Sequence, residues 1–195
     1  MIDEAAMKAI LGNNLRASRR DLLWKLDGLS EKQLRSPQTP TGLNLLGIVK
    51  HMAGVEIGYF GDTFGRPWPN HDEVITLEEF DIDPQADWFA TETQTSTSIV
   101  DLYRRVWDFA DETFASLPLD AIGAVPHWPA DRNTVTLAQM MTHVLVDLTR
   151  HLGQADVIRE AIDGQVGLNA TNPNMPEDQN WDAYLAKLRR LADNA

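Results

Sequence analysis

The sequence predicts an all-α fold in which four long helices pack as a bundle. Apolar residues recur at three- and four-residue steps in four long stretches, the spacing that gives a helix one buried face. No stretch alternates apolar and polar residues over a length that predicts a strand. A chain of 195 residues can bury a full core, and we expect residues 1–195 to form a single domain.

The first predicted helix extends from about Asp3 to Asp27, and Gly28 follows it as a typical helix stop. Residues 28–41 contain two prolines and a capping candidate at Ser30, so we expect a connection with one short helical turn. The residues expected to face the core are Ala6, Ile10, Leu15, Leu22, Leu23 and Leu26.

The second predicted helix covers residues 44–63. Two polar residues interrupt its inner face, with His51 at the margin and Glu56 near the middle. We interpret Glu56 first as a member of a buried ion pair with an arginine such as Arg150 or Arg159. Gly54, Gly58 and Gly61 would allow a neighbour or a ligand to approach closely. The inward-facing apolar residues are Leu45, Ile48, Val49, Met52, Val55, Tyr59 and Phe60.

An acidic excursion separates the second helix from the third. Residues 67–103 contain no Lys or Arg and much of the acidity of the chain. We interpret the part up to about residue 93 as a solvated acidic loop, with a substrate lid or a subunit contact as alternatives. Its expected anchors are Trp68, Phe80, Trp88 and Phe89.

The third predicted helix covers residues 95–117 and ends at Pro118. The fourth covers residues 137–164, is preceded by a good cap at Thr136 and ends at Gly164. A short C-terminal helix is expected over residues 181–191. The inward residues are Ile99, Leu102, Val106, Phe109, Thr113 and Leu117 in the third helix, and Leu137, Met141, Val144, Leu145, Leu148, Leu152, Ala155, Ile158 and Ile162 in the fourth.

Composition excludes several classes of function. The chain has no cysteine, so it offers no thiolate nucleophile or ligand, and a metal must be held by His, Asp or Glu. A net charge of −12 argues against nucleic acid and anionic membranes as partners. No secretory signal and no membrane-spanning run is evident, so we expect a cytoplasmic protein.

A polar stripe on the fourth helix offers metal ligands. His143, Asp147 and His151 lie at i, i+4 and i+8 beside the apolar face. The two histidines are about 12 Å apart along the axis, so one ion can use His143 with Asp147, or Asp147 with His151. His51 of the second helix would complete a set of three ligands. The alternative is that these histidines are only hydrogen-bonded core residues.

Other catalytic patterns are missing from the sequence. It has no HExxH, no di-iron Glu-x-x-His pair, no G-x-S-x-G elbow and no phosphate-binding glycine loop. His71 and His127 lie in predicted loops, and we interpret both as ordinary surface residues. The histidine stripe therefore remains the strongest indication of chemistry.

Two segments carry a resemblance to a known family. GIVKHMAGVE in the second helix and HVLVDLTRHLGQADVIREAIDG in the fourth resemble the DinB-like superfamily, in particular its actinobacterial mini-circle-type branch. A more distant similarity is to the N-terminal domain of mycothiol-dependent maleylpyruvate isomerase. The resemblance covers most of the chain, from the first helix to about Gly167, and implies a DinB-like four-helix bundle.

The resemblance also implies a set of metal ligands. It assigns a divalent ion to His51, Asp147 and His151, and leaves His143 as a supporting residue of the cavity. The ion would be Zn²⁺, with Ni²⁺, Mn²⁺ or Fe as alternatives. The chain departs from the family pattern at Asp147, where Glu is expected, and at Gln154, where His is common.

The implied activity is transfer or isomerisation that depends on a small thiol. A metal stabilises a thiolate, and the cofactor would be mycothiol or a similar thiol acting on a small electrophile. On this hypothesis Glu56 or His143 shuttles protons, while Trp128, Arg132 and Gln154 border the pocket. The alternative is a non-catalytic metal- or ligand-binding stress protein of the same fold. A homodimer is compatible with either.

Overall fold

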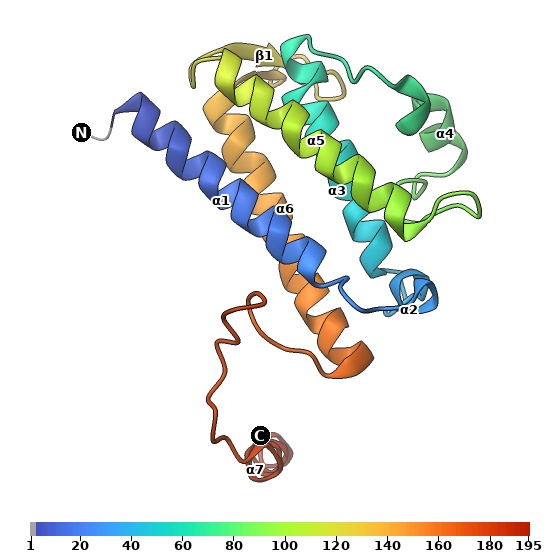
Figure 1. Cartoon of the computed structure of the whole chain (residues 1–195), viewed down its shortest axis with the longest axis vertical. Coiled ribbons are helices and arrows are strands. Elements are labelled where there is room, and N and C mark those ends of the chain that lie inside the picture. Colours follow the sequence, from blue (N-terminus) through green and yellow to red (C-terminus); the bar gives the residue numbers. More distant parts are fainter. Residues whose placement is uncertain (1–2) are drawn as a thin grey trace.

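The computed structural model describes residues 3–195 and confirms the predicted bundle of four long helices (Figure 1). Each helix lies within a few residues of its predicted bounds. The bundle consists of α1 (Glu4–Trp24), α3 (Leu45–Phe60), α5 (Ser96–Ser116) and α6 (Leu137–Asp163).

Local sequence explains where these helices begin and end. Asp3, Asn44, Thr95 and Thr136 are the N-cap residues, and the side chain of each accepts a hydrogen bond from a backbone N–H of the first turn. This satisfies donors that a helix start would leave unpaired. Gly164 ends α6 with a φ of 76°, a left-handed conformation that glycine adopts without strain.

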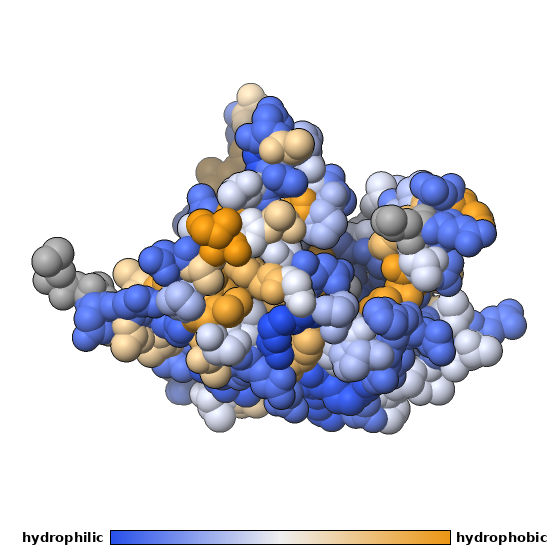
Figure 2. All heavy atoms as spheres, turned by 90° about the horizontal axis from the view of Figure 1, so that it is seen from above, coloured by the Kyte–Doolittle hydropathy of each residue, from blue (hydrophilic) through white to orange (hydrophobic). Residues whose placement is uncertain are grey.

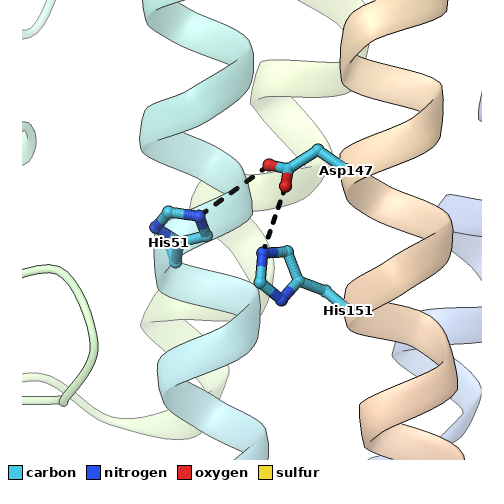
Figure 3. Close-up of side chains that lie close together, drawn as sticks. All are labelled: His51, Asp147 and His151. Carbon is cyan, nitrogen blue, oxygen red and sulfur yellow. Dashed lines mark ion pairs between the residues drawn. The ribbon is translucent and has the colours of Figure 1, made fainter.

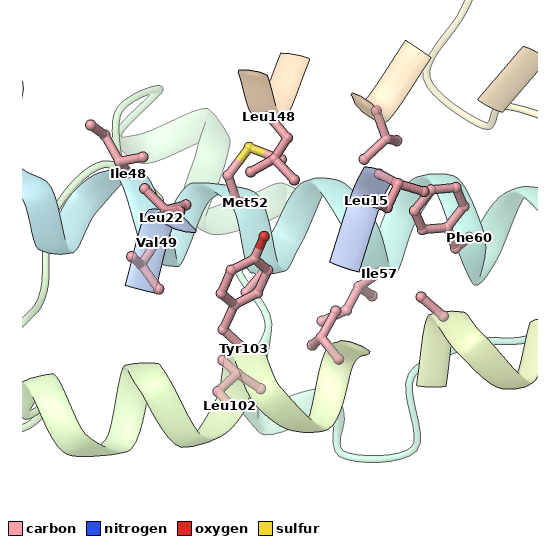
Figure 4. Packing of buried hydrophobic residues seen from close by; sticks show 14 of the residues in the cluster. Leu15, Leu22, Ile48, Val49, Met52, Ile57, Phe60, Leu102, Tyr103 and Leu148 are labelled. Atoms are coloured by element: carbon pink, nitrogen blue, oxygen red, sulfur yellow. The ribbon is translucent and has the colours of Figure 1, made fainter. Parts of the chain in front are cut away.

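The core is arranged around α3. This helix packs against α5 and α6, while α1 packs mainly against α6. Figure 4 shows the apolar side chains that meet between the helices. Ile10 was predicted to face inward but is 46% exposed, because the N-terminal turns of α1 lie at the edge of the bundle. The fully buried apolar side chains include Leu15, Leu22, Ile48, Val49, Met52, Phe60, Tyr103, Val106, Val144 and Leu148.

Several short elements join the long helices. The expected single turn after α1 is α2 (Glu31–Arg35), and the excursion contains α4 (Leu77–Ile82) between the 3-10 turn η2 (His71–Glu73) and α5. A second such turn, η1 (Asp62–Phe64), follows α3. An antiparallel hairpin pairs β1 (Ile122–Ala124) with β2 (Thr134–Thr136). The hairpin was not predicted, because three residues are too few to show an alternating pattern.

The acidic excursion is fastened to α3, while most of its described residues up to residue 93 are exposed, as expected for a solvated acidic loop. Lys50 donates to the carbonyl oxygens of Ala86 and Phe89, each at 2.8 Å, and Asn44 Nδ2 donates to the carbonyl of Trp88 at 3.0 Å. Trp68 is buried as expected, whereas the Phe89 side chain is 41% exposed. Phe89 therefore contributes its backbone carbonyl to the anchoring, and its ring lies 5.5 Å from Lys50 Nζ.

The C-terminal helix α7 (Trp181–Asp193) lies apart from the bundle (Figure 1). Every one of its residues is exposed, and its apolar side chains form a stripe at helical spacing. Among residues 3–195, no helix is long and apolar enough to cross a membrane.

Candidate metal centre

His51, Asp147 and His151 converge on one point between α3 and α6 (Figure 3). One ligand atom from each lies within 4.8 Å of the others. His151 Nε2 is 3.4 Å from Asp147 Oδ1, and His51 Nε2 is 3.9 Å from Asp147 Oδ2. Of the two pairs that the spacing on α6 left open, Asp147 with His151 is the one that His51 joins.

The positions of the three residues on α3 and α6 explain why their side chains meet. Asp147 and His151 are one turn apart on α6, so they leave the same face. His51 lies at the margin of the buried face of α3, and α3 packs against α6 along its length. The three side chains are partly buried, with exposed fractions of 17%, 33% and 13% for His51, Asp147 and His151. The centre is thus reachable from solvent.

Both imidazoles present Nε2 to the centre because Nδ1 is occupied. His51 Nδ1 lies 2.6 Å from Asp87 Oδ2, and His151 Nδ1 lies 2.8 Å from Gln154 Oε1. Both oxygens only accept, so each Nδ1 carries the proton and each Nε2 of a neutral ring keeps a lone pair. Histidine ligands of metals are commonly oriented in this way.

Trp88 of the excursion packs on the histidines. Its ring stacks on that of His51 with centroids 3.9 Å apart and 17° between the planes. The same indole meets the edge of His151 at 5.2 Å. Trp88 therefore restricts rotation of both imidazoles and shields one face of His51 from water.

Asp147 and His151 each stabilise the charged form of the other. The hydrogen bond that His151 donates when its ring is protonated is the main cause that lowers the pKa of Asp147. Burial alone would lower the pKa of His151, but hydrogen bonds to Asp147 and Gln154 raise it overall. Asp147 is consequently an anion at neutral pH, as a metal ligand must be.

The donor set fits a divalent ion such as Zn²⁺. Two imidazole nitrogens and one carboxylate oxygen are ordinary zinc ligands at about 2.0–2.1 Å, which places tetrahedral ligands roughly 3.4 Å apart. With one ligand atom from each residue the separations stay within 4.8 Å, so the three side chains must draw closer together to bind one ion. The shorter Asp147, one methylene less than the expected Glu, still reaches between the histidines. Three protein ligands would leave a position for a substrate atom.

Glu56 lies in a different environment. It is fully buried, and its carboxylate accepts hydrogen bonds from Arg19 Nε at 3.1 Å, Arg19 Nη2 at 2.5 Å and the Tyr103 hydroxyl at 3.0 Å. The predicted buried ion pair is present, but the partners named for it, Arg150 and Arg159, were wrong. Arg19 reaches Glu56 across the core of the bundle, because α1 packs mainly against α6 and α5 rather than directly on α3. This geometry gives no support to the proton-shuttle prediction for Glu56.

The remaining predicted residues lie around the centre or beyond it. His143 is exposed, and its ring meets those of Tyr59 and Trp128 edge-on at 4.9 and 5.4 Å. Arg132 is exposed on the turn between β1 and β2. Gln154 supports His151 directly through its side chain.

The sequence did not single out Asp87 as the partner of His51. Asp87 was counted only among the acidic residues of the excursion, and Trp88 only as an anchor. Nothing in the run of acidic residues distinguishes Asp87 from its neighbours. Its role depends on the path by which the excursion returns to α3.

Comparison with known proteins identifies one family. The family model described as Mycothiol-S-transferase matches residues 10–164. This range extends from α1 to the end of α6 and includes the three converging residues together with Asp87 and Gln154. None of the curated proteins matches the chain.

Proposed function

The chain belongs to the mycothiol-S-transferase family, a DinB-like four-helix-bundle family, and from this premise we propose that it is a divalent-metal-dependent enzyme that joins mycothiol to a small electrophile. The observation that carries the proposal is the convergence of His51, Asp147 and His151 inside the matched range. A chain without cysteine has no competing nucleophilic thiol, so the reacting sulfur is that of the cofactor.

His51, Asp147 and His151 would hold the ion in this mechanism. When bound, a divalent ion lowers the pKa of a nearby thiol and stabilises its thiolate. The chain's part is to orient both imidazoles through Asp87 and Gln154. In the overall reaction the S–H bond breaks and a C–S bond forms, while the leaving group departs with its electron pair.

His143 is our candidate for accepting the thiol proton. It lies one helical turn before Asp147, and its imidazole is exposed, so the neutral ring can accept a proton. Contacts with the rings of Tyr59 and Trp128 hold its imidazole between α3 and the hairpin turn.

Metal analysis and a conjugation assay test the proposal together. Protein purified without chelators should take up one equivalent of Zn²⁺, Ni²⁺, Mn²⁺ or Fe²⁺, and the loaded protein should conjugate mycothiol to monochlorobimane. His51→Ala should abolish both properties while the circular dichroism spectrum stays helical. His71→Ala removes a histidine outside the centre and should leave metal uptake unchanged.

Two outcomes would reject the enzyme assignment. If none of the four ions binds, the proposal of a metal centre is rejected. Metal uptake without conjugation of any electrophile would favour a non-catalytic binding protein, the alternative function expected for this fold.

A further inference from the structure

A cavity of about 550 Å³ lies between α3 and the acidic excursion. Its walls come from α3, from the excursion between Trp68 and Gln94, and from the start of α5. His51 and Asp87 are both part of the lining, so the cavity adjoins the candidate metal centre. In Figure 2 the excursion forms the lobe at the right, and hydrophobic surface shows on its side facing the bundle.

The accessible walls are mainly apolar. Val55, Ile57, Ile75, Phe80 and Leu102 contribute side chains to the lining. Two of the charged groups in the lining are engaged by other parts of the chain. The ammonium of Lys50 is bonded to two backbone carbonyls, and the carboxylate of Glu73 is paired with Arg105 at 2.7 Å.

Two glycines of α3 keep the cavity open. A Cβ atom added at Gly54 or Gly58 would meet no atom within 4 Å, whereas one added at Gly47 would lie 1.9 Å from the carbonyl oxygen of Trp88. Gly47 is therefore required by packing, and the other two are not. A glycine inside a helix costs about 1 kcal/mol relative to alanine. What Gly54 and Gly58 provide in return is the empty volume above them.

We propose that this cavity binds the apolar part of the electrophilic co-substrate and that Gly54 and Gly58 set the size of group it accepts. The inference rests on the proposed transferase function and adds the substrate class. Mycothiol is a polyhydroxylated thiol, and an accessible wall area that is mainly apolar suits an apolar group better than it suits such a molecule. An apolar group gains free energy here by leaving water. Because His51 is shared, the electrophile would lie beside the centre that holds the thiol.

Binding of a neutral fluorescent probe tests the cavity without metal or mycothiol. N-phenyl-1-naphthylamine should bind the complete chain saturably and in a 1:1 ratio. Gly54→Leu and Gly58→Leu fill the cavity and should each weaken binding at least tenfold. The matched control is Gly153→Leu, because Gly153 is also inside a helix with open space around its Cβ position but lies on α6 and outside the lining.

Ile75→Trp closes the cavity from the opposite wall and guards against an effect confined to α3. It too should weaken probe binding, with helical content unchanged by circular dichroism. Binding that is absent in the wild type, or equal in the wild type and in the filled variants, would overturn the inference. The latter would place the probe elsewhere, for instance on the exposed stripe of α7.

A kinetic series separates this inference from the proposed function. With bromoalkanes of increasing chain length, the wild type should show a falling KM, and Gly54→Leu should raise KM for the long members at least tenfold while sparing the short ones. Turnover without dependence on chain length or on Gly54 would overturn the cavity assignment but keep the transferase. Probe binding that responds to the glycine variants, without any turnover, would keep the cavity and reject the transferase.

Discussion

Helix α3 carries two polar clusters that differ in one decisive respect. Five residues apart on this helix, Glu56 and His51 both lie at or inside the packed bundle. The carboxylate of Glu56 is closed off by Arg19 and Tyr103. In the cluster around His51, both Nε2 atoms face Asp147 without a short hydrogen bond, as far as residues 3–195 show.

The comparison teaches how to separate structural polar groups from reactive ones. Burial raises the pKa of Tyr103 well above its usual range, and the negative charge of Glu56 raises it further. The side chains of Arg19, Glu56 and Tyr103 are fully buried and bonded to one another, so this cluster offers no open position for a ligand. The His51 cluster is half-buried, and its supporting bonds end at Nδ1. It keeps lone pairs directed at a common point.

Truncating Glu56 should have the largest effect on stability. Glu56→Ala removes the nearest partner of the buried Arg19, which keeps Asp111 at 3.4 Å, and the free energy of unfolding should fall by about 3 kcal/mol, the lower end of the range for a broken buried ion pair. Urea denaturation measures this, with Glu112→Ala, which removes an exposed partner of Arg66, as the control expected to change little. If the folded Glu56→Ala protein also lost its metal affinity, the two clusters would not be independent.

Removing Asp87, the hydrogen-bond partner of His51, should lower metal affinity and not stability. Asp87→Ala should weaken metal binding about 10- to 100-fold, the usual effect of losing a carboxylate behind a histidine ligand, and Asp87→Asn should have an intermediate effect. Competition with a chromophoric chelator measures the affinity. Asp81→Ala, on the exposed surface of α4, should bind as tightly as the wild type. Equal affinity in Asp87→Ala would show that His51 needs no orientation.

Gln154 should have a smaller effect than Asp87. Gln154→Ala should weaken metal binding by about tenfold, the lower end of the range for such supporting groups, because Gln154 is exposed and water can replace its amide. Gln154→Glu should bind the ion more tightly than the wild type, since a carboxylate makes His151 more basic. The same chelator competition tests both. Weaker binding by Gln154→Glu would contradict this role for the hydrogen bond.

The smallest expected effect is the loss of stability that acid causes at the Glu73–Arg105 ion pair, which involves the excursion. Hydrogen bonds from Arg105 are the main cause that lowers the pKa of Glu73 from about 4.5 to about 2. A lowered folded pKa stabilises the structure above pH 4.5, and the stabilisation is lost as the pH falls towards 2. The pair is partly exposed and should contribute about 0.2–1 kcal/mol.

Tryptophan fluorescence should follow this loss, because Trp68 Nε1 also donates to Glu73 at 3.2 Å. The emission of the wild type should approach that of Glu73→Gln as the pH falls through this range, while Glu73→Gln itself changes little. An unchanged difference between the two proteins at pH 1.5, below the folded pKa of Glu73 of about 2, would contradict the assignment of this titration to Glu73.

Sequence patterns predicted the bundle and part of the centre. The stripes of α1, α3, α5 and α6 are long enough for their period to be evident, whereas three-residue strands show none. His51 and the α6 residues were found because their spacing is local and the family pattern joins the two helices. Asp87 and the Arg19–Glu56 pair depend on how distant segments cross. Residue spacing within one helix carries no information about such crossings.

The anchoring of the excursion has a consequence for how this family can diversify. Lys50 and Asn44 hold it through main-chain oxygens of residues 86, 88 and 89, which every amino acid possesses. Substitutions along most of the excursion can therefore accumulate without releasing it from α3. Evolution could remodel the wall facing the cavity while Asp87 and Trp88 stay beside His51, so that substrate range changes and the chemistry is inherited.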